Sequence, residues 1–438
     1  MRDHFYQLID NLAGELDGDL QLHATLSGEE SDFVRFNHAR VRQAGHVSQH
    51  GLQLALVTGR KHASGDCELS GTLDADLMAA RSLLAELRDL LYNCPDDPYL
   101  NYNEQPCSSE DSRNEPLPPL GQVIETISQA TADLDLVGIY AAGDLVRGYA
   151  NSLGQKNWLA RSIFNLDWSC HTPANQAVKS HYAGSRWHTA TLQQHIDSQR
   201  QALAILDRPA KQLAPGRYRA YLAPSALAEL LELLSHDGFS LRELRTCQSS
   251  LLKLEQGNRR LSPAVSMQDN RGAAYEPLFS DEGFMLPASV PLIDNGEFAD
   301  ALVDARSARE YSAPVNAATE VPGSLEMAPG DLADSDILTA LDTGLYINHL
   351  WYANYSDSNN CRMTGMTRYA CYWVENGQIR APLAVMRFDD SLYRLLGEQL
   401  EAITRERQFM HSADSYDERS LASMHLPGIL CSEFRLTL

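Results

Sequence analysis

The hydrophobic pattern changes its period within the N-terminal part of this 438-residue chain, and that change constrains the fold most. Four segments alternate apolar and polar side chains, as half-buried strands do: residues 20–26, 32–36, 40–43 and 52–57. Residues 72–91 instead carry one apolar stripe at helical spacing, made of Leu77, Ala80, Leu84, Leu87 and Leu91. Sheets and amphipathic helices bury their apolar sides against each other. The pattern therefore predicts an α+β domain.

The rest of the first half continues this domain. Helices are predicted at about 3–16, 121–132 and 191–206, and strands at 136–140 and 158–168. Gly45 and Gly51 are expected at hairpin turns. Residues 93–120 are rich in proline, so we expect an irregular excursion there.

The second half is predicted to be strand-rich, with one helix near its start. A strand at 218–222 precedes a helix at 226–236, and further strands are expected at 344–352, at 368–374 and from 378 onward. Asn376-Gly377 favours a type I′ turn between the last two. We predict a two-domain α+β protein: an N-terminal α/β-sheet domain with hairpins over residues 1–206, and a strand-rich C-terminal domain over 207–438.

The charge of the chain argues against nucleic-acid and membrane partners, and its cysteine pattern indicates a reducing compartment. The formal net charge is −22, whereas nucleic acids and anionic membranes attract basic surfaces. The first ten residues include acidic side chains where a signal peptide needs an apolar core. The eight cysteines are scattered without a Cys-x-x-Cys pair. We therefore expect a cytoplasmic protein with reduced thiols, no nucleic-acid partner and no membrane partner.

The predicted helix at 226–236 holds the most informative short motif. Leu231-Glu232-Leu-Leu-Ser-His236 matches the zinc-peptidase pattern His-Glu-x-x-x-His, except that leucine replaces the first histidine. In such a helix the histidines bind zinc and the glutamate takes a proton from the metal-bound water. Glu232 and His236 are equally compatible with an ordinary solvated face of a leucine-rich helix.

Several segments resemble the TldD/PmbA family. The strongest match is the hairpin Cys371-Tyr-Trp-Val-Glu-Asn-Gly-Gln-Ile-Arg-Ala-Pro382, and Thr343-Gly-Leu-Tyr-Ile-Asn-His-Leu precedes it. Shorter matches follow the family's order at 150–154, 215–218 and 280–283. The resemblance implies the degenerate metallopeptidase helix of the C-terminal domain and, in active members, a bound zinc ion.

The resemblance also implies which zinc ligands are missing. The first histidine falls at Leu231, the general base at Glu232 and the second histidine at His236. A further cysteine ligand should fall at about 405–426, where the chain has none; His411 and His425 are the alternatives there, and Cys431 lies beyond. A catalytic zinc normally keeps three protein ligands. We therefore expect no cofactor and interpret Glu232 and His236 as remnants of a site in the inactivated, TldE/PmbA-like branch.

The resemblance implies a non-catalytic partner subunit that pairs with a catalytic TldD-like homologue in a proteolytic complex. Tyr346, Trp351 and Tyr352 are candidates for peptide binding on a predicted strand, although aromatics in strands usually belong to sheet core. Two alternatives stay open: an active metallopeptidase with a site rearranged around Glu232 and His236, or a homodimeric peptide-binding modulator without a catalytic partner.

Overall fold

Four long strands form the N-terminal sheet. The computed structural model describes residues 1–174 and 176–437. In it, β1 (Gln21–Asn37) pairs antiparallel with β2 (Arg40–Thr58) and β5 (Asp135–Asn151), and β5 pairs with β6 (Lys156–His171). Each of β1 and β2 therefore spans two of the predicted segments. Gly45 and Gly51 are not at turns: they lie inside β2, opposite β1, and the turn falls between β1 and β2.

The sheet order is β3-β2-β1-β5-β6, and two short strands share the outer edge of β6. β3 (Lys61–Glu68) closes the other edge. β4 (Ser109–Arg113) runs parallel to the first part of β6, and β7 (Ala177–Gly184) runs antiparallel to the second part. The proline-rich segment is thus irregular on both sides of β4 but contributes that strand to the sheet. β7 was not predicted from the sequence.

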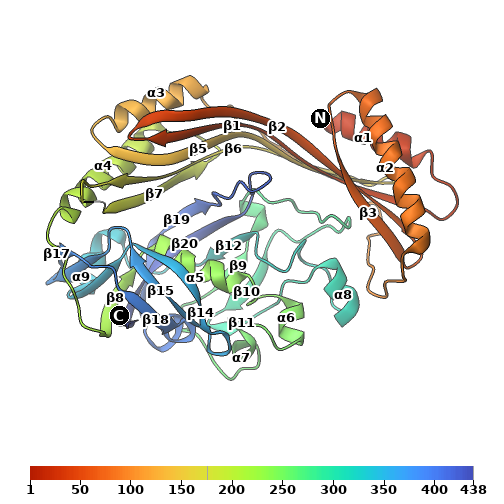
Figure 1. The fold of residues 1–438 in the computed structure, drawn as a ribbon. Coiled ribbons are helices and arrows are strands. Elements are labelled where there is room, and N and C mark those ends of the chain that lie inside the picture. Colours follow the sequence, from red (N-terminus) through yellow and green to blue (C-terminus); the bar gives the residue numbers. More distant parts are fainter. Residues whose placement is uncertain (175, 438) are drawn as a thin grey trace.

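Helices cover one face of this sheet at its two ends (Figure 1). At one end α1 (Arg2–Ala13) and α2 (Leu73–Asn93) share a core with side chains of β1, β2 and β6. At the other end α3 (Leu120–Ala130) and α4 (Thr189–Leu206) share a second core with β5 and β6. On the opposite face, Leu145, Tyr149 and Ile163 pack against Phe279 and Leu421 of the C-terminal domain. The N-terminal domain therefore turns a bare sheet face toward the second half of the chain.

A second, larger sheet organises the C-terminal domain. Its strands are β8 (Gly216–Leu222), β9 (Met267–Asp269), β10 (Val290–Asp294), β11 (Glu297–Phe298), β12 (Ser324–Met327), β13 (Gly344–Ile347), β14 (His349–Asp357), β15 (Arg362–Arg368), β16 (Tyr372–Glu375), β17 (Gln378–Pro382), β18 (Arg387–Ser391), β19 (Leu400–His411) and β20 (Ser423–Leu436). Its helices are α5 (Pro224–Ser235), α6 (Leu241–Arg245), α7 (Leu252–Glu255), α8 (Ala305–Tyr311) and α9 (Ile337–Leu341). These two sheets with their helices confirm the predicted two-domain α+β fold.

The Asn376-Gly377 turn is confirmed, whereas two predicted strands are interrupted. Asn376 has φ 52° and Gly377 φ 68°, as a type I′ turn requires, and β16 and β17 pair antiparallel around it. The segment predicted at 344–352 is split between β13 and β14, and the one at 368–374 between β15 and β16. The boundary expected at 206/207 stays a prediction. Among the described residues, no helix combines the length and apolarity needed to cross a membrane.

The tip of the β19–β20 hairpin joins the two domains through one buried arginine. Arg419 donates from its guanidinium to the Ser31 hydroxyl at 3.1 Å and to the Ile163 carbonyl at 3.0 Å. Its backbone N–H donates to the Glu29 carboxylate at 3.1 Å. Burial lowers the pKa of Arg419 to about 10, while the Glu29 charge opposes this, so the guanidinium is charged at neutral pH. The hairpin is thereby held against the bare face of the N-terminal sheet.

We predict that Arg419→Met lowers the free energy of unfolding by roughly 3–5 kcal/mol, because the buried Ser31 hydroxyl and Ile163 carbonyl would lose two hydrogen bonds from a charged donor, and Glu29 would lose a nearby positive charge. Urea unfolding followed by tryptophan fluorescence measures this. Arg309→Met on α8 is the control, since Arg309 is exposed and has no ion pair among the described residues. The control should change stability by less than about 0.5 kcal/mol. Equal stability of the two variants would contradict the role given to Arg419.

Candidate functional site

Helix α5 divides its side chains between the domain core and the space between the domains. Its leucine-rich stripe is buried in the main core of the C-terminal domain. Pro224 begins the helix, where a missing N–H costs nothing, and the Ser225 hydroxyl donates to the Asn348 carbonyl at 2.7 Å. Glu232 is exposed on the other side of the helix, and His236, also exposed, follows its last residue. Both retained residues of the motif therefore point away from the core.

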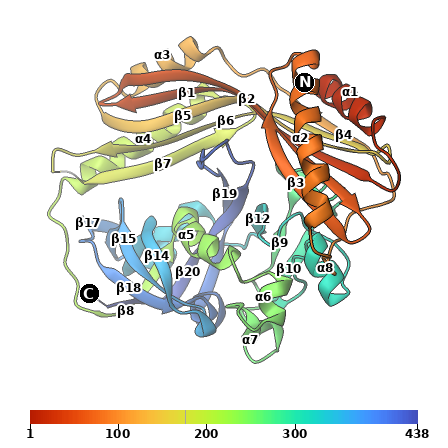
Figure 2. The same ribbon diagram turned by 45° about the vertical axis from the view of Figure 1, so that its right-hand side comes forward.

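A cleft of about 1030 Å³ lies between the domains over this polar side of α5. Its lining comes from β6, β7 and α4 of the N-terminal domain on one side, and from C-terminal elements that include α5 and the β19–β20 hairpin on the other. The ribbons of these elements can be followed in Figure 2. Asp167, Lys179 and His181 come from the first wall. Glu232 and His236 come from the second, so these two predicted site residues lie in an interdomain cleft.

Five histidines line the cleft: His181, His195, His236, His349 and His411. His411 is only 4% exposed, and neither of its ring nitrogens has a hydrogen-bond partner among the described residues. Burial, together with the smaller effects of the charges on Arg419 and His181, lowers the pKa of His411 to about 3. Burial likewise lowers the pKa of His349 to about 3. At neutral pH both side chains are uncharged and offer hydrogen-bonding nitrogens to the cleft.

One ion pair belongs to the N-terminal wall. Lys179 Nζ lies 3.4 Å from the Asp167 carboxylate, and the ring of His181 accepts a hydrogen bond from the backbone N–H of His411 at 3.1 Å. Burial acts to raise the pKa of Asp167, but hydrogen bonding to His181 and the charge of Lys179 outweigh it and hold the pKa below its usual value. Asp167 is thus ionised and paired with the ammonium group of Lys179.

The residues do not fit the three-ligand zinc site that the resemblance implies. Leu231 is completely buried in the core, and it lies five residues from His236, roughly 140° around the helix. Glu232 and His236 are four residues apart and share the cleft face. Among residues 1–174 and 176–437 no group of three or more His, Cys, Asp or Glu side chains is arranged to hold a metal ion. No catalytic step is therefore derived through zinc.

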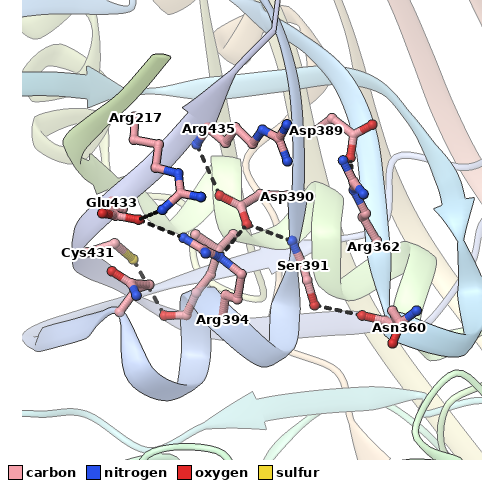
Figure 3. Close-up of polar contacts among 12 residues, drawn as sticks. Arg217, Asn360, Arg362, Asp389, Asp390, Ser391, Arg394, Cys431, Glu433 and Arg435 are labelled. Atoms are coloured by element: carbon pink, nitrogen blue, oxygen red, sulfur yellow. Dashed lines mark hydrogen bonds and ion pairs between the residues drawn. The ribbon is translucent and has the colours of Figure 1, made fainter.

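Three residues near the C-terminus were considered as alternative zinc ligands, and two of them lie outside the cleft. His425 lies on β20, half-buried, with its ring 3.6 Å from the Glu326 carboxylate, and it does not line the cleft. Cys431 is buried, and its thiol donates to the Leu395 carbonyl at 3.5 Å (Figure 3). His411 lines the cleft. Of these candidates, only His411 shares the cleft with the two motif residues.

A network of charged side chains that includes Asp390 lies near the buried Cys431 thiol. Arg394 joins the Asp390 carboxylate at 3.1 Å and the Glu433 carboxylate at 2.9 Å (Figure 3). The Asp390 carboxylate also accepts from the Arg435 backbone N–H at 3.0 Å. Burial and the nearby Asp390 raise the pKa of the Cys431 thiol, so the metal-binding thiolate is disfavoured. This network serves to anchor β20 to the neighbouring β18 and the turn after it.

The three aromatic candidates are separated by the break between β13 and β14. Tyr346 lines the cleft and packs against Tyr221 and Tyr372, with ring centroids 4.9 and 5.9 Å apart. Trp351 and Tyr352 lie outside the cleft lining on β14, where Tyr352 has φ 57° at a register shift and is 76% exposed. The Arg368 guanidinium lies 4.2 Å from the centre of the Trp351 ring. Peptide binding by these aromatics stays a prediction, and only Tyr346 is placed for it in the cleft.

Several cleft residues were missed from the sequence. Asp167 lies on a strand that was predicted, but nothing in its local pattern distinguishes it from other polar positions. Lys179 and His181 lie on β7, which was not predicted, and His349 lies just after the break between β13 and β14. These residues come together only in the folded protein, where β7 pairs with β6 and also contacts β19 of the C-terminal domain. No local sequence pattern shows these contacts.

Comparison with known proteins decides the family. Residues 215–438, half of the chain, match the model of the PmbA/TldA metallopeptidase C-terminal domain. The chain belongs to the TldD/PmbA family. The curated protein sequences yield no significant match.

Three solved structures share the fold over nearly the whole chain. TldE from Thermococcus kodakarensis is 14% identical and has a TM-score of 0.74, with 99% of this chain and 100% of that one covered. A protein from Thermotoga maritima, named for modulation of a DNA gyrase, is 13% identical with a TM-score of 0.73 and 99% of each chain covered. A similarly named protein from Bacteroides thetaiotaomicron is 14% identical with a TM-score of 0.76, covering 99% of this chain and 98% of that one. The TldD/PmbA fold therefore extends to the N-terminal domain.

From the orientation of α5 we predict different effects on zinc affinity for two substitutions that introduce a histidine. Glu232→His places two imidazoles four residues apart on the cleft face, and zinc should bind at least about tenfold more tightly than to the unaltered chain. Leu231→His places the imidazole in the core, so it should gain no zinc affinity and lose roughly 2–5 kcal/mol of stability. Zinc titration calorimetry and thermal unfolding measure the two effects. Zinc gained by Leu231→His but not by Glu232→His would overturn the orientation of α5.

Proposed function

We propose that this chain is a non-catalytic member of the TldD/PmbA family that holds peptides in its interdomain cleft and acts as the partner subunit of a catalytic homologue. The observation that carries the proposal is the composition of the cleft. Helix α5 contributes a single histidine to it, Leu231 is buried, and no cysteine lines it among the described residues. The chain thus keeps the family's fold and cleft but lacks a zinc ligand set.

The shape of the cleft supports the peptide part of the proposal. A volume of about 1030 Å³ is at the upper end for small-molecule sites and is sufficient for several residues of an extended chain. The walls mix aromatic side chains such as Tyr346 and Tyr372 with polar groups such as Gln408 and Asn348. Such a lining can contact both the side chains and the backbone of a peptide.

The partner part of the proposal rests on family membership and on the name of one relative in fold, TldE. A family member that lacks the zinc ligands contributes to proteolysis only if another chain supplies them. The catalytic chain is expected to carry an intact His-Glu-x-x-x-His helix. A homodimeric modulator would instead purify without such a chain.

Affinity purification from the native cell, followed by mass spectrometry, should recover a homologue with the intact motif. The purified chain alone should hydrolyse an unfolded casein substrate no faster than the protein-free background, whereas the recovered complex should hydrolyse it. The proposal fails if the chain alone hydrolyses casein and both a zinc chelator and Glu232→Gln abolish that activity. Recovery of the chain only as a homodimer would contradict the partner role.

A further inference from the structure

The cleft carries an excess of negative charge. Its lining includes five carboxylates, Asp167, Glu229, Glu232, Asp334 and Asp414, but only one basic side chain apart from histidine, Lys179. Lys179 is paired with Asp167. The other four carboxylates form no ion pair with any described residue. Apart from Lys179, the lining offers only histidines as basic groups, and burial lowers the pKa of three of them, His195, His349 and His411.

Two of these carboxylates lie side by side on α5. Glu229 and Glu232 are three residues apart, so they are neighbours on the helix surface, and neither accepts a hydrogen bond from a described residue. Burial raises the pKa of Glu229 and the charge of Glu232 adds to this effect, while the charge of Lys179 acts in the opposite direction. A helix gains nothing from two like charges at this spacing. A ligand bearing positive charge would remove this repulsion.

A second observation, independent of the carboxylates, also points to a ligand that donates hydrogen bonds. His411 is nine-tenths buried and lines the same cleft, yet neither of its ring nitrogens has a hydrogen-bond partner within residues 1–174 and 176–437. Within the same residues, His349 Nδ1 is buried without a partner as well. A neutral imidazole has one nitrogen that accepts a hydrogen bond. Leaving such a buried group unpaired costs stability, which a ligand N–H group can restore.

We infer that the cleft selects peptides that carry a cationic nitrogen group, a guanidinium or an ammonium, which binds between Glu229 and Glu232 with the imidazoles of His349 and His411 as further acceptors. The inference rests on the proposed peptide-holding function and names its substrate class. The cationic group comes either from an arginine or lysine side chain or from the free amino terminus of the peptide. Glu232, the remnant of the zinc-peptidase motif, then serves to bind substrate charge.

The test compares short peptides by calorimetric titration of the full chain. One peptide is capped at both ends and contains arginine, a second replaces arginine with citrulline, its uncharged isostere, and a third contains citrulline and a free amino terminus. The arginine peptide should bind at least about tenfold more tightly than the capped citrulline peptide, as a charged hydrogen bond implies. If the third peptide binds more tightly than the capped citrulline peptide, the free amino terminus is a source of the positive charge.

Glu229→Gln with Glu232→Gln should abolish this preference while the protein remains folded, since both carboxamides keep the shape of the side chain. Glu86→Gln, an exposed helical position in the N-terminal domain, is the matched control and should leave the preference intact. Equal binding of all three peptides would overturn the inference but leave peptide holding in place. No binding of any peptide would contradict the proposed function itself, and a preference that survives the double substitution would assign the charge recognition elsewhere.

Discussion

The burial of one leucine-rich face of α5 is the constraint on which the site depends. A helix at the surface of a domain packs one side against the core. In α5 this side is formed by Leu227, Leu230, Leu231 and Leu234, each at most 1% exposed. The remaining positions, Glu229, Glu232 and His236, are thereby fixed on the cleft side. The same packing that stabilises the C-terminal domain therefore determines which side chains a ligand can meet.

The cleft exists because two sheets are held face to face. One wall comes from β7, α4 and the neighbouring part of β6. The β19–β20 hairpin reaches across to the bare face of the N-terminal sheet and is fixed there by Arg419. Since the hairpin also carries His411 into the cleft, the interdomain contact and the site are parts of one structural element. Family membership accounts for the architecture, and the side chains that line the cleft determine the chemistry that this chain offers.

Sequence patterns were sufficient where burial was one-sided. The helix at α5 was placed within two residues because its leucines recur at helical spacing, and the Asn376-Gly377 hairpin followed from backbone conformations that few residues adopt. β2 was predicted as two fragments because the stretch between them begins with residues 44–46, which are exposed on both faces and therefore need no alternation of apolar and polar side chains. The partnership of Asp167 with Lys179 joins two strands, and that of His181 with His411 joins the two domains. Such contacts depend on the tertiary fold and leave no local pattern.

We propose that the cleft of this chain lacks the family's zinc chemistry and holds peptides. Elemental analysis of the chain, purified from its native cell without chelators, tests the first half of this proposal directly. We expect far less than one zinc ion per chain. We also expect the same zinc content in the His236→Ala variant. One zinc ion per chain that disappears in His236→Ala would contradict this proposal.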